Sequence, residues 1–301
     1  MKDNAHAMVL ASLTADALAL GAHWIYDTDK IAREIGRVDR LLAPPPGSYH
    51  PGKGRGDFTH YGDQTMILLQ SLAATGDFSL DDFAARWRQF SSTTSSYLDR
   101  ATKDSLARFD QGAGPADSGS PSTDLGGPAR IAPLVCRYRD DLEALLAAAR
   151  SQTAMTHTGP GTADGAAFIA RTAHAVLHGA TPLEAVTAAL EAGIGEIDLD
   201  LRLRLAIDSA NRESVAVIRE FGQMCAINAA LPGAVHFIVR YGDNLREALV
   251  ENVMAGGDSA ARGMVIGMIL GAAGGTQAIP GEWLQDLAAL PRIRSSLDRL
   301  G

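Results

Sequence analysis

The run VMAGGDSAARGMVIGMILGAAGG, residues 253 to 275, holds the two patterns that decide the fold. Its second half is apolar and rich in glycine, which suits a buried helix that packs closely on another helix. Its first half carries Asp258 and Arg262, four residues apart. Gly256 and Gly257 end the preceding helix, so Asp258 can cap a new helix, with Arg262 on the same face as an ion-pair partner. The same pattern also fits a ligand site, with a carboxylate held at a helix start at the bottom of a pocket.

The composition is that of a chain with a large buried core. Of its 301 residues, 46% are hydrophobic, enough for one large domain or two ordinary ones. The 27 basic and 35 acidic residues give a net charge of −8. This balance argues against a general binder of nucleic acids or membrane surfaces, because both functions need a basic face. It is compatible with a nucleotide-sized ligand in a local pocket.

Cysteine usage and the first residues indicate the compartment. Cys136 and Cys225 lie outside any CxxC pair, and we expect both to be buried thiols in a reducing compartment. The opening MKDNAHAMVLASLTADALALG carries Asp3 and Asp16 and no cleavage site, so it predicts a first helix rather than an export signal. The apolar run 263–275 is too short to span a membrane. The expected location is the cytoplasm.

The 3.6-residue spacing of apolar positions predicts helices along almost the whole chain. Ser79 before an acidic turn and Thr181 before Pro182 are helix-start signals. The one strand-like run, Val235 to Tyr241, has neighbours that favour helix, so there is no case for a sheet. No composition break or solenoid repeat divides the chain. We predict one all-α domain, residues 1–301, with helices at 5–22, 65–75, 83–90, 140–150, 164–178, 182–192, 199–220, 245–254 and 263–274.

Two long loops are predicted, Pro44 to Gly62 and Gln111 to Pro128. Loops of this length in a compact domain are usually functional or mobile. The first loop places Lys53 and Arg55 among alternating glycines. Such a backbone can approach a phosphate closely, but a solvated turn is the favoured interpretation of this pattern.

Several polar residues stand at helix junctions, where structural and functional roles both fit. In HYGDQT, residues 60 to 65, Asp63 can cap a helix that begins at Gln64, and it can also contact a ligand. His157 precedes a turn, where a histidine is often a satisfied structural residue. Asp16 lies within an apolar helix face, and a carboxylate there is costly unless it is paired or ligand-bound.

Two further segments have the same double character. Gly126 and Gly127 make a sharp turn into a helix beside Arg130, with exposed amides nearby. The run HWIY, residues 23 to 26, follows the first helix. Its aromatic side chains can wall a pocket or fill a core.

In this order along the chain, the segments resemble the signature of the ADP-ribosylglycohydrolase superfamily, whose members share an all-helical domain. The resemblance implies a single compact orthogonal helical domain of that type. It covers nearly the whole chain, including residues 222–239 before the last box. The matches are Asp16-Ala17-Leu18 for the end of the N-terminal helix, Gly62 to Thr65 for a TDDT-type box, Leu125 to Leu134 for an NGSAMRxAPL-type turn, Thr156-His157 for a TH box, and Gly256 to Asp258 with Gly267 to Ala272 for a GGDTDT box followed by GxxxGA.

The resemblance also implies a metal site. In hydrolytic relatives the two acidic boxes bind a pair of Mg²⁺ ions that hold ADP-ribose and position water. Here Asp63 and Asp258 remain as metal ligands, with Gln64 as a neutral third. Mg²⁺ prefers oxygen ligands and often binds through one or two carboxylates plus water and phosphate, so we expect one ion, or none, rather than a pair. The departures are Gly62, Gln64, Ala260 and Ala261, which stand where the family has Thr, Asp, Asp and Thr.

The sequence GGDSAARG resembles the second box of a branch of the superfamily that includes the J1 crystallins and selenoprotein J. In that branch the second box carries an arginine where Arg262 stands. Because a guanidinium is permanently cationic and pairs with carboxylate or phosphate, we predict that Arg262 replaces the lost metal charge beside Asp258.

Three functions are compatible with the resemblance. The first is a hydrolase that cleaves a glycosidic bond of an ADP-ribosyl or related nucleotide conjugate, with Asp63 activating water and His60 or His157 moving a proton. The second is a non-catalytic binder of ADP-ribose-like ligands or a crystallin-like structural protein, because acidic ligands are lost. Hydrolysis of an unrelated small substrate is a third, since a fold does not fix function. The predicted ligand-binding residues are Asp16, Gln64, Gly126, Gly127, Arg130 and Arg262.

Overall fold

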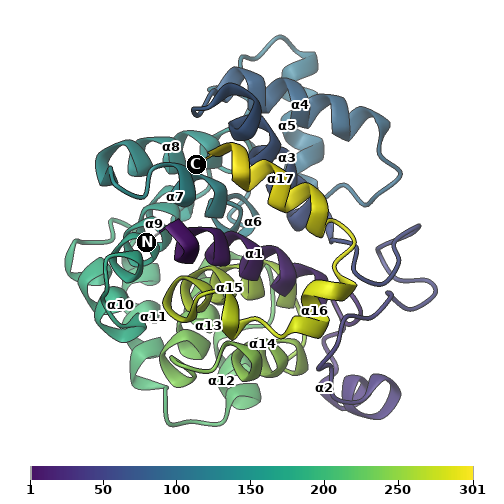
Figure 1. Cartoon of the computed structure of the whole chain (residues 1–301), viewed down its shortest axis with the longest axis vertical. Coiled ribbons are helices and arrows are strands. Elements are labelled where there is room, and N and C mark those ends of the chain that lie inside the picture. Colours follow the sequence, from purple (N-terminus) through teal and green to yellow (C-terminus); the bar gives the residue numbers. More distant parts are fainter. Residues whose placement is uncertain (1, 301) are drawn as a thin grey trace.

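The glycine-rich run forms a central helix. In the computed structural model, α15 (Ser259–Gly274) packs along α1 (Lys2–Ala19), so that segments from the two ends of the sequence lie side by side (Figure 1). The close approach depends on glycine, because a Cβ atom on Gly267 would lie 2.5 Å from the carbonyl oxygen of Ala11. The small-residue faces predicted for both helices therefore meet. The structure describes residues 2–300.

Further helices enclose this pair, and their buried side chains form one apolar core. Helix α1 also contacts α3 and α7, and α15 contacts α9, α13 and α14. The other elements are α2 (Thr28–Lys30), the π-helix η1 (Ile31–Ile35), α3 (His60–Thr75), α4 (Leu80–Thr93), α5 (Arg100–Asp110), α6 (Gly126–Ala129), α7 (Ala132–Arg137), α8 (Leu142–Ala154), α9 (Thr162–Leu177), α10 (Pro182–Glu191), α11 (Ile197–Asp208), α12 (Ser214–Phe221), α13 (Ile227–Arg240), α14 (Leu245–Met254), the 3-10 helix η2 (Thr276–Ala278), α16 (Gly281–Asp286) and α17 (Leu290–Leu300).

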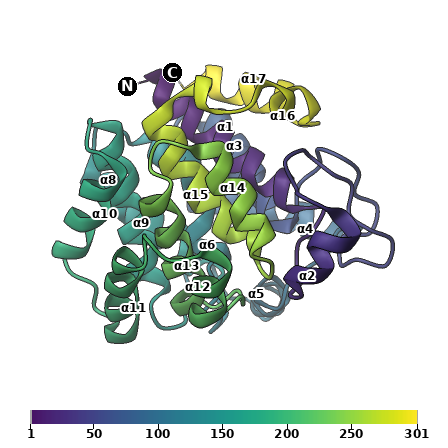
Figure 2. The same cartoon turned by 90° about the horizontal axis from the view of Figure 1, so that it is seen from below.

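The predicted all-α class is confirmed. Between residues 2 and 300 the only β-type pairs are two isolated bridges, and the strand-like run from Val235 lies in α13. Figure 2 shows the irregular segment between η1 and α3 on the side of the molecule opposite α8 and α10. Within the described chain, no helix combines the length and hydropathy needed to cross a bilayer.

Several helices differ from the predicted ranges, α5 among them because it was not predicted, and two of the differences have a clear local cause. Asp63 is not the cap of α3, because the helix begins one turn earlier and Thr59 accepts the hydrogen bond from the Tyr61 N–H. The predicted helix 199–220 is two helices. The break has a local cause, since the Glu213 carboxylate accepts from the backbone of Val215 and Ala216 and starts α12.

Candidate functional site

The predicted signature segments meet where α1 ends and where α3 and α15 begin. Asp16 joins α1 to α3: its Oδ2 accepts a 2.7 Å hydrogen bond from the Thr59 N–H, and its Oδ1 accepts from the Thr59 hydroxyl at 2.5 Å. The carboxylate is enclosed, and this burial raises its pKa to about 6 despite the two hydrogen bonds. Asp16 thus anchors the start of α3.

Asp16 also explains the glycine at the first position of the acidic box. A Cβ atom on Gly62 would lie 2.4 Å from Asp16 Oδ2 and 2.8 Å from Phe58 Cβ. The threonine that the family carries at this position does not fit above the buried carboxylate.

Asp258 is the hub between α15, α1 and α3. Its Oδ1 caps α15 by accepting from the Ala261 N–H at 3.3 Å, as predicted. The same oxygen lies 3.0 Å from His23 Nε2, and Oδ2 accepts a 2.8 Å hydrogen bond from the Tyr61 hydroxyl. Burial opposes the charge of Asp258, but these hydrogen bonds lower its pKa. The carboxylate is therefore ionised.

A second histidine extends this network toward the surface. His23 Nδ1 lies 2.8 Å from His50 Nε2. Burial lowers the pKa of both histidines, that of His50 to about 3. A neutral His23 that donates from Nε2 to Asp258 must accept at Nδ1 from His50. The chain His50–His23–Asp258–Tyr61 consequently has one consistent set of proton positions.

The predicted ion pair between Asp258 and Arg262 is wrong. Arg262 donates from Nε to Asn252 Oδ1 at 2.7 Å, and from Nη2 to the carbonyls of Asn252 and Gly256 at 3.0 and 2.9 Å. No carboxylate of the described chain lies within 4 Å of its guanidinium. A cation is favourable beside the free carbonyls at the end of α14, and His23 and Tyr61 already occupy Asp258. Arg262 therefore fixes the turn between α14 and α15.

Arg130 and Gln64 form a second buried network. Gln64 Oε1 accepts from Arg130 Nη1 at 2.5 Å and from Trp87 Nε1 at 2.9 Å. Arg130 also donates to Gln152 Oε1 at 2.6 Å and to the Thr156 hydroxyl. Burial lowers the pKa of Arg130 to about 10, which leaves it charged at neutral pH. The amide oxygen predicted as a neutral metal ligand is thus already doubly hydrogen-bonded.

The glycine turn packs against aromatic rings. A Cβ atom on Gly126 would lie 2.6 Å from the Tyr61 ring, and one on Gly127 would lie 2.8 Å from His157 Nδ1. His157 Nδ1 bonds the Thr156 hydroxyl at 2.8 Å, and its Nε2 is buried without a hydrogen-bond partner among the described residues. Burial, reinforced by Arg130, lowers the pKa of His157 to about 3, so the ring is neutral.

A lysine occupies the first acidic box. Lys53 Nζ lies 2.6 Å from Asp63 Oδ2, and both side chains are 14% exposed. Burial raises the pKa of Asp63, and Lys53 opposes this rise. The long loop before α3 therefore delivers a cation to the carboxylate that was predicted to bind a metal.

The donor set does not fit the family's pair of Mg²⁺ ions. Magnesium needs free oxygen lone pairs in near-octahedral arrangement. Asp63 is bound by Lys53, and Asp258 is bound by His23 and Tyr61. Within residues 2–300, no three His, Cys, Asp or Glu side chains are grouped so that they could hold a metal ion.

Aromatic rings cover the signature residues. We define the aromatic cluster as Trp24, Tyr49, His50, His60 and Tyr97. The Trp24 ring meets Tyr97 and Tyr49 edge to face at 5.0 and 5.2 Å between centroids, and it lies 5.4 Å from His60. The cluster closes over His60, which is only 3% exposed, whereas Tyr49 is 61% exposed.

Trp24 holds an unusual backbone conformation in this cluster. Its φ is 65°, the only positive φ of a non-glycine residue in the described chain. For a bulky residue such a φ costs free energy and is often found at functional sites. Reciprocal backbone hydrogen bonds of 2.9 Å enforce it, from Trp24 N to Gly257 O and from Gly257 N to Ile25 O. A cavity of about 460 Å³ adjoins Trp24, His23 and Tyr49.

Two carboxylates beside the aromatic cluster were missed by the sequence reasoning. Asp99 caps α5, and its Oδ2 lies 3.3 Å from His60 Nε2. Burial opposes its charge, but the approach of His60 lowers the pKa of Asp99. Asp124 is half-buried, and its pKa is raised by burial and by the nearby charges of Asp258 and Asp99. Burial raises the pKa of Tyr97, and the charges of Asp99 and Asp124 add to this rise.

Cys225 lies beside Asp124 and is only half-buried, contrary to the prediction, whereas Cys136 is buried. The segment of Cys225 pairs with that of Asp124 through backbone hydrogen bonds of 2.8 Å, from Leu125 N to Cys225 O and from Ile227 N to Thr123 O. The position of Asp124, two residues before the glycine turn, could have marked it as a site residue. For Asp99 the sequence indicated only a helix cap.

Comparison with known proteins defines the class. The chain belongs to the ADP-ribosylglycohydrolase family, whose model matches residues 1–301, and the resemblance found in the sequence is confirmed. It is similar to crystallin J1A of Tripedalia cystophora, with 25% identity covering 94% of this chain and 92% of the crystallin. It is also similar to ADP-ribosylhydrolase ARH3 of Mus musculus, with 23% identity covering 86% of this chain and 81% of the mouse protein.

Two further relatives extend these matches. An uncharacterised protein of Archaeoglobus fulgidus is 26% identical, over 95% of this chain and 92% of its own length. A solved structure described as an ADP-ribosylglycohydrolase-related protein complex superposes with a TM-score of 0.78 at 23% identity, covering 99% of this chain and 97% of that one. This likeness shows a common fold.

Proposed function

We propose that this protein hydrolyses a glycosidic bond of an ADP-ribosyl or related nucleotide conjugate, using its own side chains where the family uses a metal pair. One observation carries the proposal. Two carboxylates at the aromatic cluster have pKa values displaced in opposite directions, with Asp99 lowered and Asp124 raised. Such a divergence separates an ionised carboxylate from a proton-carrying one, as glycosidic hydrolysis requires.

The roles follow from the directions of these shifts. Asp124, whose pKa is raised, is assigned as the group that gives a proton to the leaving group as the bond to the anomeric carbon breaks. Asp99, kept ionised by His60, faces the positive charge that develops on the ribose. Asp124 then takes a proton from the water that adds to the anomeric carbon. Protons and charges therefore balance over the cycle, and His60 acts by holding Asp99 ionised.

The aromatic cluster supplies binding in this proposal. The rings of Trp24 and Tyr97 offer apolar faces on which a base or sugar can stack. Asp63, His60 and His157 stay predicted catalytic residues. Asp63 is the half-buried member of this set. Because Lys53 binds its carboxylate, Asp63 can orient water only if Lys53 moves aside or itself helps to hold the water.

Release of ADP-ribose from peptides of defined linkage tests the proposal. Full-length protein is assayed by mass spectrometry with Mg²⁺ and after chelation, and equal rates are expected. Asp124→Asn should lower kcat by about 10²- to 10⁴-fold, the usual range for a general acid–base group. The control is Asp110→Asn, an exposed carboxylate on α5. Activity that survives Asp124→Asn, or that depends on Mg²⁺, contradicts the proposal.

The second candidate is a non-catalytic binder or a crystallin-like structural protein. This candidate is favoured because Lys53 and His23 already bind the carboxylates of Asp63 and Asp258. Two relatives named crystallin also favour it. Calorimetric titration of ADP-ribose, with Mg²⁺ and after chelation, separates the candidates. Binding without turnover favours the binder, and absence of binding removes ADP-ribose from both.

A further inference from the structure

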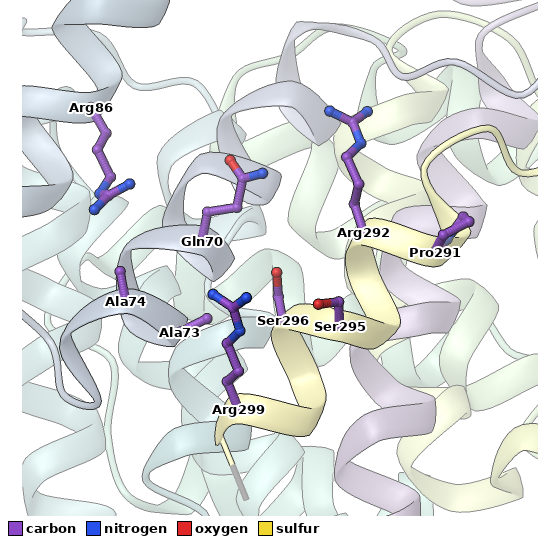
Figure 3. A pocket seen from close by; sticks show the side chains of 9 residues that line it. All are labelled: Gln70, Ala73, Ala74, Arg86, Pro291, Arg292, Ser295, Ser296 and Arg299. Atoms are coloured by element: carbon purple, nitrogen blue, oxygen red, sulfur yellow. The ribbon is translucent and has the colours of Figure 1, made fainter.

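A groove far along α3 from the signature residues is lined by hydrogen-bond donors. It lies between α3, α4 and α17 and has a volume of about 500 Å³ (Figure 3). Its lining carries three arginines and no acidic residue. The polar lining residues are Gln70, Arg86, Arg292, Ser295, Ser296 and Arg299.

One face of α17 supplies four of these donors. Arg292, Ser295, Ser296 and Arg299 have the spacing i, i+3, i+4, i+7, which places them on a single helix face. The buried residues of α17 are Ile293, Ser296 and Leu297. Ser296 thus lies at the edge of the face that holds α17 in place. Arg292, Ser295 and Arg299 are exposed, and packing of the helix does not account for these three side chains.

The charge of this face is unbalanced. Arg86 is paired with Asp82 at 2.7 Å. For Arg292 and Arg299, no side-chain carboxylate of residues 2–300 lies within 4 Å. This cluster occurs in a chain with a net charge of −8. In Figure 3 the Gln70 amide lies between the guanidinium groups of Arg86 and Arg292, with Arg299 below it.

We propose that this groove binds a phosphate-bearing anion. A guanidinium presents a planar fork of donors that matches a phosphate bidentately, and serine hydroxyls add single hydrogen bonds. Two guanidinium groups without carboxylate partners suit a dianionic or larger oxyanion. The volume lies within the roughly 300–1,000 Å³ of small-molecule sites. This proposal is independent of the hydrolase proposal.

Calorimetric titration of inorganic pyrophosphate into the full-length protein at low ionic strength tests the groove. We expect saturable binding at one site. Arg292→Ala combined with Arg299→Ala should weaken it at least tenfold, corresponding to about 1.4 kcal/mol. The matched control is Arg294→Ala, on the same helix but beside a different cavity that includes His6 and Asp298, and its affinity should be unchanged.

Three results would overturn the proposal. They are absence of saturable binding, equal weakening by Arg294→Ala, and citrate binding as tightly as pyrophosphate. Thermal unfolding of each variant shows whether the fold is kept. Because Arg292, Arg294 and Arg299 are all exposed on α17, we expect each variant to remain folded. A parallel titration with ADP distinguishes the sources: tighter binding of ADP assigns the groove to a nucleotide, and equal binding assigns it to free pyrophosphate.

Discussion

His23 and Asp258 are separated by 235 positions in the chain, yet their side chains are 3.0 Å apart and both are buried. The contact ties the turn that follows α1 to the residue that caps α15. With the hydrogen bond from Tyr61, it makes Asp258 a structural hub rather than an open ligand.

His23→Phe should destabilise the protein by about 3 kcal/mol, because it removes a hydrogen bond from a buried, ionised carboxylate. Urea unfolding measures the change. The control is His178→Phe, since His178 is exposed and the change should stay within about 0.5 kcal/mol. Equal stability of the two variants would show that Asp258 does not depend on His23.

Asp16 should make the protein less stable as pH rises. Its pKa is about 6 in the fold, above the ordinary value of 3.8, so the native state binds the proton more tightly. Its contribution is complete below about pH 4 and is lost as pH rises through about 6, at most about 3 kcal/mol in total. The measurement is the free energy of unfolding from pH 4 to 7, compared with Asp16→Asn, in which this slope should vanish. An unchanged slope would assign the pH dependence to other groups.

At Trp24 we expect a glycine variant to be more stable than an alanine variant, the reverse of the usual order of stability. Both Trp24→Gly and Trp24→Ala lose the ring contacts, but only glycine adopts a φ of 65° without strain. We expect the glycine variant to be more stable than the alanine variant by about 1 kcal/mol. Thermal unfolding of the pair checks this. A more stable alanine variant would indicate that the backbone relaxes when the ring is removed.

Mg²⁺ should leave the stability of the wild-type protein unchanged, because Lys53 and His23 occupy the carboxylates. A ligand that binds only the native state would raise Tm in proportion to ln(1 + [L]/Kd). Differential scanning calorimetry with Mg²⁺ and with chelator tests this. Lys53→Ala is the informative comparison, since it frees Asp63, and a rise of Tm with Mg²⁺ is expected in this variant alone. A rise in the wild type would restore a metal site.

Gly62→Thr, which restores the residue of the family box, should destabilise the protein by about 2–4 kcal/mol through overpacking against Asp16. The nearest atom to a new Cβ is the enclosed Asp16 Oδ2, which cannot move without losing Thr59. Urea unfolding measures the loss. A control is Gly76→Ala, whose Cβ would meet nothing within 4 Å, although its φ of 76° adds strain. A stable Gly62→Thr variant would show that the loop before α3 adapts.

The sequence allowed the fold to be predicted because its signals are local. The small residues of α1 and α15 and the caps at Ser79, Thr181 and Asp258 depend on short-range patterns, and all are present. The signature residues were also correctly expected to gather. Family order supplied that expectation, since nothing in the spacing alone relates Asp16 to Thr59.

The partners of the site residues could not be predicted, because they come from distant segments. The four-residue spacing of Asp258 and Arg262 suggested an ion pair, but Asp258 precedes the helix and bonds His23 and Tyr61 instead. Lys53 was expected to contact phosphate or solvent and binds Asp63. These choices depend on how the loop before α3 crosses the end of α1, which no local pattern encodes.

The pairing of α1 with α15 has a consequence for synthesis. During translation α1 leaves the ribosome before α15, with its small-residue face exposed, and its partner ends only at Gly274. At about 5–20 residues per second, the nascent chain waits for many seconds before the interface and the network of His23 and Asp258 can form. Emergence of α15 is thus the event that permits the central pair to close, and chains interrupted before α15 present an unpaired helix to chaperones and proteases.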